Sequence, residues 1–164
     1  DVVGKTEQDF YKLADPLGAC SINIFRPGWF HAWHFDESEF TTTLCLQQSE
    51  EGGEFEFTPA LRESQEDLVA AQVASVVNEH SPYTAEAEGT LNHQSVPITK
   101  ASFEPGTLQI FAGRYSLHHV KRIPEHCKED RLVAVLCFAD KVDSYNSREV
   151  QEMFWGRSST VRND

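Results

Sequence analysis

Hydrophobic and polar positions alternate in several short stretches of the chain, which is the pattern of half-buried β-strands. Residues 21–25 and 54–57 alternate, and residues 41–47 between them are rich in β-branched residues. Three later strands are expected over residues 106–111, 115–120 and 131–138, the last of them an apolar run after Arg131. Gly52-Gly53 separates residues 41–47 from residues 54–57. A hairpin turn is favoured there over a close approach of two backbone segments.

A helical period replaces this alternation in the middle of the chain. Val69, Val73, Val76 and Val77 fall at helical spacing, and residues 63–78 contain neither Gly nor Pro, so we predict a helix there. A short terminal helix is expected over residues 147–155, with Ser147 as its N-cap. Residues 80–105 carry Ser, Pro, Gly and Asn and are expected to form a long loop, with one or two short strands between 95 and 102.

Many short strands, Gly-containing turns and few helices predict a mainly β fold, either a sandwich or a barrel, with the jelly roll as one form. The 164 residues are the length of one domain, which we assign to residues 1–164. The longest apolar run, residues 132–139, is eight residues long, too short to cross a membrane.

Charge and cysteine content narrow the expected partners. The chain has 14 Lys and Arg against 26 Asp and Glu, a net charge of −12, and it has no basic cluster for phosphates. Nucleic acid and membrane are therefore not expected as partners, whereas a small molecule is. The four cysteines form no Cys-x-x-Cys pair and are expected to be reduced core thiols. No basic-then-apolar leader is visible, so a cytoplasmic location is expected.

Candidate chemistry begins at His34 and Asp36. On a strand, these side chains share one face about 7 Å apart, near enough to hold one metal. His118 on the strand 115–120 is the natural third ligand, because His119 faces the opposite way. Two imidazoles and a carboxylate are the donor set of non-haem iron(II) sites. The alternative is that these are ordinary structural polar residues. Solvated surface positions are expected for four other histidines: His80, His93, His119 and His126.

Arg131 stands at the head of the apolar run 132–138. An Arg in this position is either a solvated charge at a strand end or a buried clamp for a carboxylate, which a guanidinium binds in a bidentate way. The residues alone leave both interpretations open.

In their order and spacing, these stretches resemble the iron(II)- and 2-oxoglutarate-dependent oxygenases. The resemblance covers about residues 22–138 and is carried by His34-x-Asp36, residues 41–47, residues 52–57, residues 106–120 and Arg131. Within that superfamily, residues 33–40 and 113–118 resemble the branch that contains free amino acid halogenases and their hydroxylase relatives.

The resemblance implies a double-stranded β-helix, or jelly roll, with one or two supporting helices. It implies iron(II) held by His34, Asp36 and His118, and 2-oxoglutarate held at its far carboxylate by Arg131. The reaction would use O2, release succinate and carbon dioxide, and hydroxylate an unactivated C–H of a free amino acid or derivative. Because Asp36 keeps the carboxylate that a small residue replaces in the halogenases, hydroxylation is the expected outcome.

The same resemblance suggests substrate contacts. His31 and Trp155 match by position residues that line the amino acid pocket of the halogenase branch, and Arg114 is a further candidate to bind a substrate carboxylate. Val133 and Val135 depart from the family, because polar groups would hold the amino acid end there.

Several alternatives remain at this point. The same iron site would serve a halogenase, a desaturase or a protein hydroxylase, and a non-catalytic jelly-roll module would bind zinc or another ligand. Arg131 favours the oxygenase, since a plain metal site needs no carboxylate clamp. Family members carry additional N-terminal helices and strands, so truncation at the N-terminus is one expectation, and both a monomer and a homodimer remain open.

Overall fold

The computed structural model describes residues 4–80 and 96–159. Within them lie nine strands and two helices: β1 (Tyr11–Lys12), β2 (Cys20–Phe25), β3 (His31–His34), β4 (Phe40–Gln47), β5 (Phe55–Ala60), α1 (Ala70–His80), β6 (Thr99–Lys100), β7 (Leu108–Phe111), β8 (Ser116–Val120), β9 (Arg131–Ala139) and α2 (Arg148–Trp155). The six predicted strands are all present, and β6 lies where a short strand was expected.

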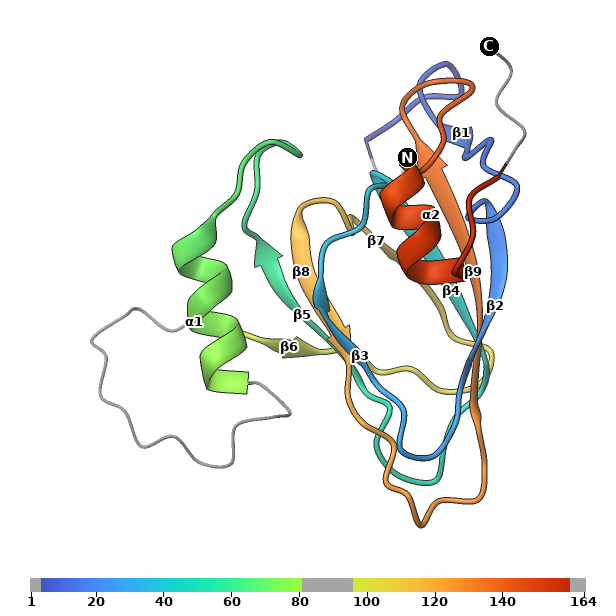
Figure 1. Cartoon of the computed structure of the whole chain (residues 1–164), viewed down its shortest axis with the longest axis vertical. Coiled ribbons are helices and arrows are strands. Elements are labelled where there is room, and N and C mark those ends of the chain that lie inside the picture. Colours follow the sequence, from blue (N-terminus) through green and yellow to red (C-terminus); the bar gives the residue numbers. More distant parts are fainter. Residues whose placement is uncertain (1–3, 81–95, 160–164) are drawn as a thin grey trace.

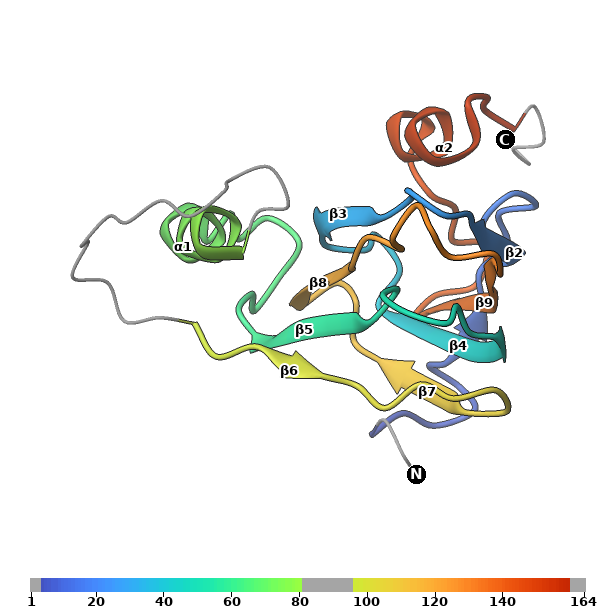
Figure 2. The same cartoon turned by 90° about the horizontal axis from the view of Figure 1, so that it is seen from below.

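Two antiparallel sheets face each other (Figures 1 and 2). One contains β2, β9, β4 and β7 in that spatial order, with β1 also paired to β9. The other contains β3, β8, β5 and β6. Strands that follow one another in the chain mostly lie in opposite sheets, which is the winding of a jelly roll. The expected mainly β, double-stranded β-helix fold is therefore confirmed.

Strand alternation decides what lies between the sheets. Along β9, the residues at 131, 133, 135 and 137 line an internal cavity, whereas those at 132, 134 and 136 face the other way. Along β4, the cavity-facing set contains Thr41 and Thr43. The space between the sheets is thus a cavity with both polar and apolar walls, and it positions the candidate site.

The two helices lie outside the sheets. α2 lies across the opening between β3 and β2, and α1 lies on the side of β5 and β8 that is turned away from the other sheet (Figures 1 and 2). Ser147 is the predicted N-cap of α2 and accepts a hydrogen bond from the Val150 amide at 3.2 Å. Gly156 ends the helix in the left-handed conformation. Neither helix of the described residues is long and apolar enough to cross a membrane.

The helix predicted over residues 63–78 begins later, at Ala70. Residues 64–67 form turns instead, and the Asp67 amide donates to the Ser64 carbonyl. Val69 adopts a φ of 40°, outside the helical region, so a helix cannot continue through it. The valine spacing is confirmed only in part: Val76 is almost completely buried and Val73 is half-buried, but Val77 is exposed and Val69 lies before the helix.

The hairpin turn predicted at Gly52-Gly53 is wrong. The flanking strands β4 and β5 lie in different sheets, so the segment crosses between them. Both glycines have a positive φ. A Cβ at Gly52 would lie 2.4 Å from the Arg122 carbonyl oxygen, and one at Gly53 would lie 2.9 Å from the Arg131 Cδ. Close backbone approach explains these glycines.

The expectations for the cysteines and for several histidines have different outcomes. All four cysteines are free, as expected, but Cys20 is exposed rather than in the core, since it lies on an outward-facing position of β2. His126 is exposed as predicted. The central part of the predicted loop, with His93, lies outside the described residues, and so does the side chain of His80.

Candidate metal centre

Three predicted ligands converge at one place in the cavity. The Oδ1 atom of Asp36 lies 3.6 Å from the Nε2 atom of His34 and 3.5 Å from the Nε2 atom of His118. One donor atom from each residue lies within 4.8 Å of the others. The two distances from Asp36 Oδ1, 3.5 and 3.6 Å, are too long for good hydrogen bonds. They are close to the roughly 3–3.5 Å expected between neighbouring ligands of an ion with bonds near 2.1 Å.

Backbone carbonyls determine which nitrogen of each imidazole is available. The Nδ1 atom of His34 lies 2.8 Å from the Ala32 carbonyl oxygen, and Nδ1 of His118 lies 2.9 Å from that of Ser116. A carbonyl only accepts hydrogen bonds, so both Nδ1 atoms carry the proton. The lone pairs of both Nε2 atoms are left to bind a metal, which is the usual arrangement of metal-binding histidines.

Asp36 does not lie on a strand as predicted, because β3 ends at His34. Two hydrogen bonds hold it instead. The Thr41 hydroxyl donates to its Oδ2 at 2.6 Å, and its amide donates to the Gly113 carbonyl at 3.0 Å. A Cβ at Gly113 would lie 2.1 Å from the same Oδ2 atom, so this position requires glycine. Oδ2 is thereby engaged and Oδ1 faces the histidines.

Asp36 stays ionised in this setting. Burial alone would raise the pKa of its carboxyl group, but the imidazoles of His118 and His34 outweigh that effect and hold the pKa well below its usual range. The Asp36 carboxylate and the Nε2 atoms of both imidazoles therefore face a common point.

The donor set fits a divalent transition metal. Iron(II) in facial sites of two histidines and one carboxylate keeps further positions for other ligands, and zinc accepts the same donors. The protonation of both Nδ1 atoms and the engagement of Oδ2 leave one donor from each residue for an ion, so the residues present fit the implied metal.

Arg131 lies in the same cavity and is 5% exposed. Its guanidinium lies 4.9 Å from the ring centre of Phe103 and 5.2 Å from that of Phe25. Among the residues that the structure describes, no carboxylate forms an ion pair with it. Burial lowers the pKa of Arg131 to about 10, which leaves it charged at neutral pH. The structure therefore excludes the solvated strand-end interpretation.

His31 and Trp155 also line the cavity. The ring centre of His31 lies 4.0 Å from that of His34, with the two rings tilted by 37°, and the His31 ring contacts Phe154 edge-on at 5.4 Å. Burial, reinforced by His34 and His118, lowers the pKa of His31 to about 3, so its ring is neutral. Val133 and Val135 form apolar wall positions, as their sequence positions indicated.

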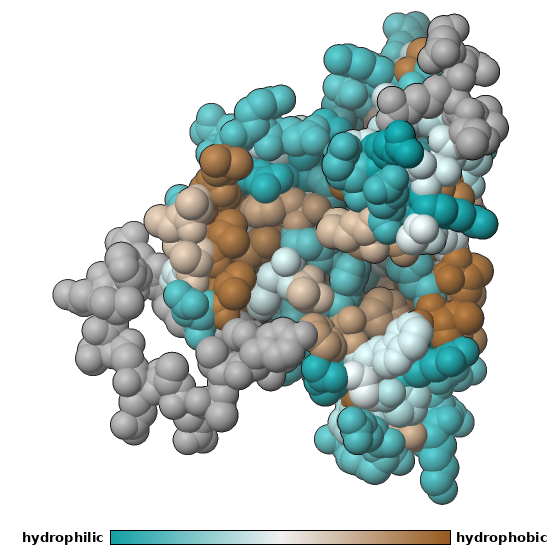
Figure 3. Space-filling model, in the orientation of Figure 1, coloured by the Kyte–Doolittle hydropathy of each residue, from teal (hydrophilic) through white to brown (hydrophobic). Residues whose placement is uncertain are grey.

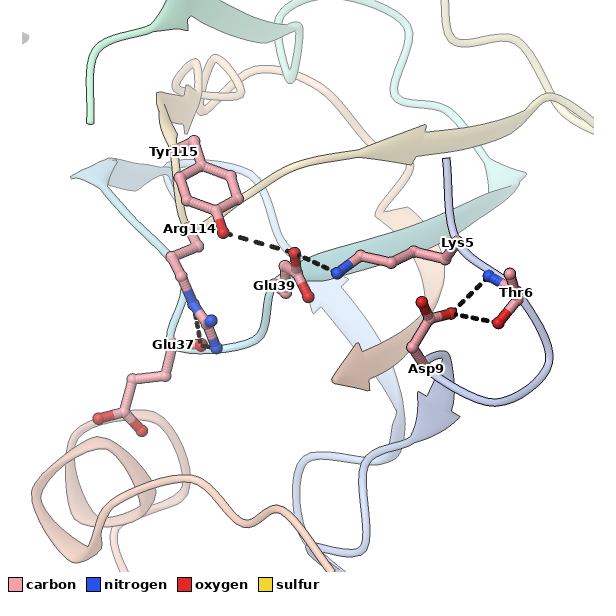
Figure 4. Close-up of polar contacts among 7 residues, drawn as sticks. All are labelled: Lys5, Thr6, Asp9, Glu37, Glu39, Arg114 and Tyr115. Atoms are coloured by element: carbon pink, nitrogen blue, oxygen red, sulfur yellow. Dashed lines mark hydrogen bonds and ion pairs between the residues drawn. The ribbon is translucent and has the colours of Figure 1, made fainter. Parts of the chain in front are cut away.

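Arg114 is not brought to this cavity. Its guanidinium donates twice to the main-chain carbonyl of Glu37, at 2.6 and 3.0 Å, and it lines a separate polar depression (Figure 4). The Glu37 side chain turns away from it and accepts from the Ser147 amide at 2.6 Å. In this structure Arg114 braces the segment that follows Asp36.

His119 is a buried residue, not the solvated surface histidine that was expected. It points away from the cavity, and its ring stacks on Trp33 with centres 3.8 Å apart. Its Nε2 atom lies 3.0 Å from the Glu56 Oε2. Adjacent strand positions supply this partner, because Glu56 is opposite His119 in the pairing of β5 with β8.

Sequence analysis missed two groups at the site. Thr41 was noted only as part of a β-rich stretch, although its inward position on β4, next to a His-x-Asp motif, is a usable signal. Trp29, Met153 and Phe154 line the cavity from segments whose position depends on tertiary structure. No local pattern identifies such residues.

Comparisons with known proteins concern the fold alone. No protein-family model matches the sequence, and no curated protein matches it. Among solved structures, the chain is similar to a prolyl-4-hydroxylase from Pseudomonas putida, with a TM-score of 0.45, 16% identity, and coverage of 74% of this chain and 51% of that one. It is also similar to PvcB, an Fe, alpha-ketoglutarate dependent oxygenase from an isonitrile synthetic pathway, with a TM-score of 0.44, 12% identity and coverage of 74% and 64%.

The chain thus spans about half to two thirds of the length of these proteins. A likeness this distant does not place the chain in a family. The chemistry has to come from the residues of the site.

Proposed function

We propose that this protein is an iron(II)- and 2-oxoglutarate-dependent dioxygenase that hydroxylates an unactivated C–H of a small molecule, a free amino acid or a derivative of one. One observation carries the proposal: the convergent donors of His34, Asp36 and His118 line the same cavity as the buried, unpaired guanidinium of Arg131. A metal site alone does not need this cation. A co-substrate with a carboxylate does.

Each of these residues has a defined task in the proposed reaction. His34, Asp36 and His118 hold iron(II), and Arg131 binds the far carboxylate of 2-oxoglutarate. When bound, iron and 2-oxoglutarate supply the oxidation of a C–H bond by O2, with succinate and carbon dioxide as co-products. The Thr41 hydroxyl donates a hydrogen bond to Oδ2 of Asp36. The carboxylate therefore presents its other oxygen, Oδ1, to the metal.

The cavity walls orient the substrate and exclude water. The cavity has a volume of about 620 Å³, enough for 2-oxoglutarate and a small substrate together. His31 and Trp155 support the amino acid-like substrate class because both line this space. Asp36 supports hydroxylation rather than halogenation, since an anchored carboxylate occupies the position that a halide would need.

An anaerobic titration tests the proposal. Iron(II) and then 2-oxoglutarate are added to the purified metal-free protein, and the visible charge-transfer band of the chelated co-substrate is recorded. We expect a saturable band that is lost in Asp36→Ala and His118→Ala. Iron bound equally by the parent and both variants, without a band, would instead favour a jelly-roll binding module.

A further inference from the structure

The mouth of the cavity is rimmed by large apolar side chains that remain exposed to solvent. Trp29 is 53% exposed, Met153 69% and Phe154 39%, and all three line the same cavity as the metal centre. On the face of the molecule that carries α2, moderately hydrophobic residues lie among hydrophilic ones near the middle, and the most hydrophobic residues lie over α1 and at the opposite edge (Figure 3). Single exposed apolar residues are ordinary, but several at one cavity mouth indicate a ligand surface.

This rim is continuous with the metal centre. The ring of Phe154 lies 5.4 Å from that of His31 and 6.0 Å from that of His34. α2 holds Met153 and Phe154 in place because both of its ends are capped, by Ser147 and by Gly156. A molecule that enters the cavity therefore meets apolar surface from the rim to the first metal ligand.

The charges of the cavity restrict what that molecule carries. Among the lining residues, all of which belong to the described part of the chain, Arg131 is the one Lys or Arg. The proposed function assigns it to 2-oxoglutarate. The two lining carboxylates are Asp36, which faces the metal, and Glu37, which accepts from the Ser147 amide. Arg26 lies 5.6 Å from the Trp29 ring centre but does not line the cavity. Apart from the metal itself, a second carboxylate in the cavity would have no cationic partner and would be costly to desolvate.

We propose that the substrate is a small molecule with an aromatic or branched aliphatic group and no free carboxylate, such as an amino acid derivative whose carboxyl group is masked as an amide. Its apolar group packs against Trp29, Met153 and Phe154. This inference rests on the proposed function, which assigns Arg131 to 2-oxoglutarate. The inference narrows the substrate class from free amino acids to their uncharged or cationic derivatives.

Three probes test the two parts of the proposal separately. N-acetyl-phenylalaninamide is neutral and aromatic, N-acetylphenylalanine adds a carboxylate, and N-acetylglycinamide lacks the ring. Their binding to the protein loaded with iron(II) and 2-oxoglutarate is measured without oxygen by calorimetry or saturation-transfer NMR. We expect the first to bind at least about tenfold more tightly than each of the others.

Variants of the rim locate the binding. Phe154→Gln and Met153→Gln each weaken binding of N-acetyl-phenylalaninamide at least about threefold, because each removes apolar contact area. Leu108→Gln is the matched control, since Leu108 is 59% exposed on β7 and does not line the cavity, and it leaves binding unchanged. Equal binding of N-acetylglycinamide, or full binding by both rim variants, would overturn the apolar part. Equal binding of N-acetylphenylalanine to the loaded protein would overturn the carboxylate part.

A second set of titrations separates this inference from the proposed function. In protein without metal or co-substrate, N-acetylphenylalanine is expected to bind through Arg131 and to be displaced by 2-oxoglutarate. Failure of 2-oxoglutarate to displace it, together with absence of the charge-transfer band, would count against the oxygenase. Rim-dependent binding of the neutral probe is measured independently of that result.

Discussion

Two histidine–carboxylate clusters lie back to back on β8, one residue apart in sequence. On the cavity side, His118 and His34 direct their Nε2 atoms at one oxygen of Asp36, at 3.5 and 3.6 Å. On the outer side, His119 lies at hydrogen-bond distance, 3.0 Å, from Glu56, whose other oxygen lies 3.3 Å from the Lys121 ammonium.

The two clusters differ in whether their polar groups already have partners. The outer carboxylate has a cation or imidazole at each oxygen, and Trp33 covers the His119 ring, so the cluster is complete as it stands. In the inner cluster, each imidazole is oriented by a carbonyl through Nδ1, and three donor atoms converge without hydrogen bonds between them. The same residue types therefore build a structural contact on one face and a ligand set on the other.

The largest expected effect comes from the same carboxylate-to-amide change in each cluster. Asp36→Asn removes the negative charge from the donor set and is expected to weaken binding of iron(II), or of cobalt(II) as a spectroscopic stand-in, at least about 100-fold. Glu56→Gln is expected to leave metal affinity unchanged and to lower the free energy of unfolding by about 1 kcal/mol. Metal titration and chemical denaturation of both variants measure this contrast. A loss of metal affinity in Glu56→Gln would show that the clusters are coupled.

Replacement of Arg131 tests whether co-substrate binding can be lost while metal binding is kept. We expect Arg131→Leu to weaken binding of 2-oxoglutarate by about tenfold or more while iron(II) affinity persists, because the lost group contacts the far carboxylate only. The free energy of unfolding should stay the same or rise by about 1 kcal/mol, since a buried, unpaired cation is costly. Unchanged turnover of 2-oxoglutarate in this variant would remove the clamp from the proposal.

Thr41 tests whether the inner carboxylate needs its anchor. Thr41→Val keeps the side-chain shape but removes the donor to Asp36 Oδ2, and we expect about tenfold weaker metal binding. Thr41→Ser retains a hydroxyl and is expected to restore most of the affinity. Cobalt(II) absorption spectra report the ligand geometry directly. Identical spectra for the parent and Thr41→Val would exclude a positioning role.

The smallest effect concerns acid stability of the outer cluster. Burial would raise the pKa of Glu56, but the hydrogen bond to His119 and the charge of Lys121 lower it overall from the ordinary value of 4.5. A lowered folded-state pKa contributes stability that is present above 4.5 and is lost as pH falls through the folded-state value. The difference in free energy of unfolding between the parent and Glu56→Gln should therefore shrink below about pH 4.5. Denaturation series from pH 7 to pH 3 measure it, and a difference that grows toward acid would have the wrong sign.

Much of the fold was predictable because strand patterns are local. The β-branched stretch at 41–47 and the apolar run at 131–138 became β4 and β9, and Ser147 capped α2. The start of α1 was not predictable, since the backbone of Val69 in the left-handed region decides it. Gly52-Gly53 carried a turn signal, but the position of β4 and β5 in different sheets made it a crossing segment.

The sequence by itself determined the donor types and placed His118 and His119 on opposite faces of one strand. Side chains alternate along a strand, so the assignment of His118 inward and His119 outward depends on period alone. Tertiary structure decided the rest: that Arg131 is buried without a carboxylate, that Thr41 and Gly113 hold Asp36 beyond the end of β3, and that α2 brings Phe154 to the cavity mouth. These features depend on contacts between segments far apart in the chain, and burial and hydrogen bonding across such distances leave no local periodicity to detect.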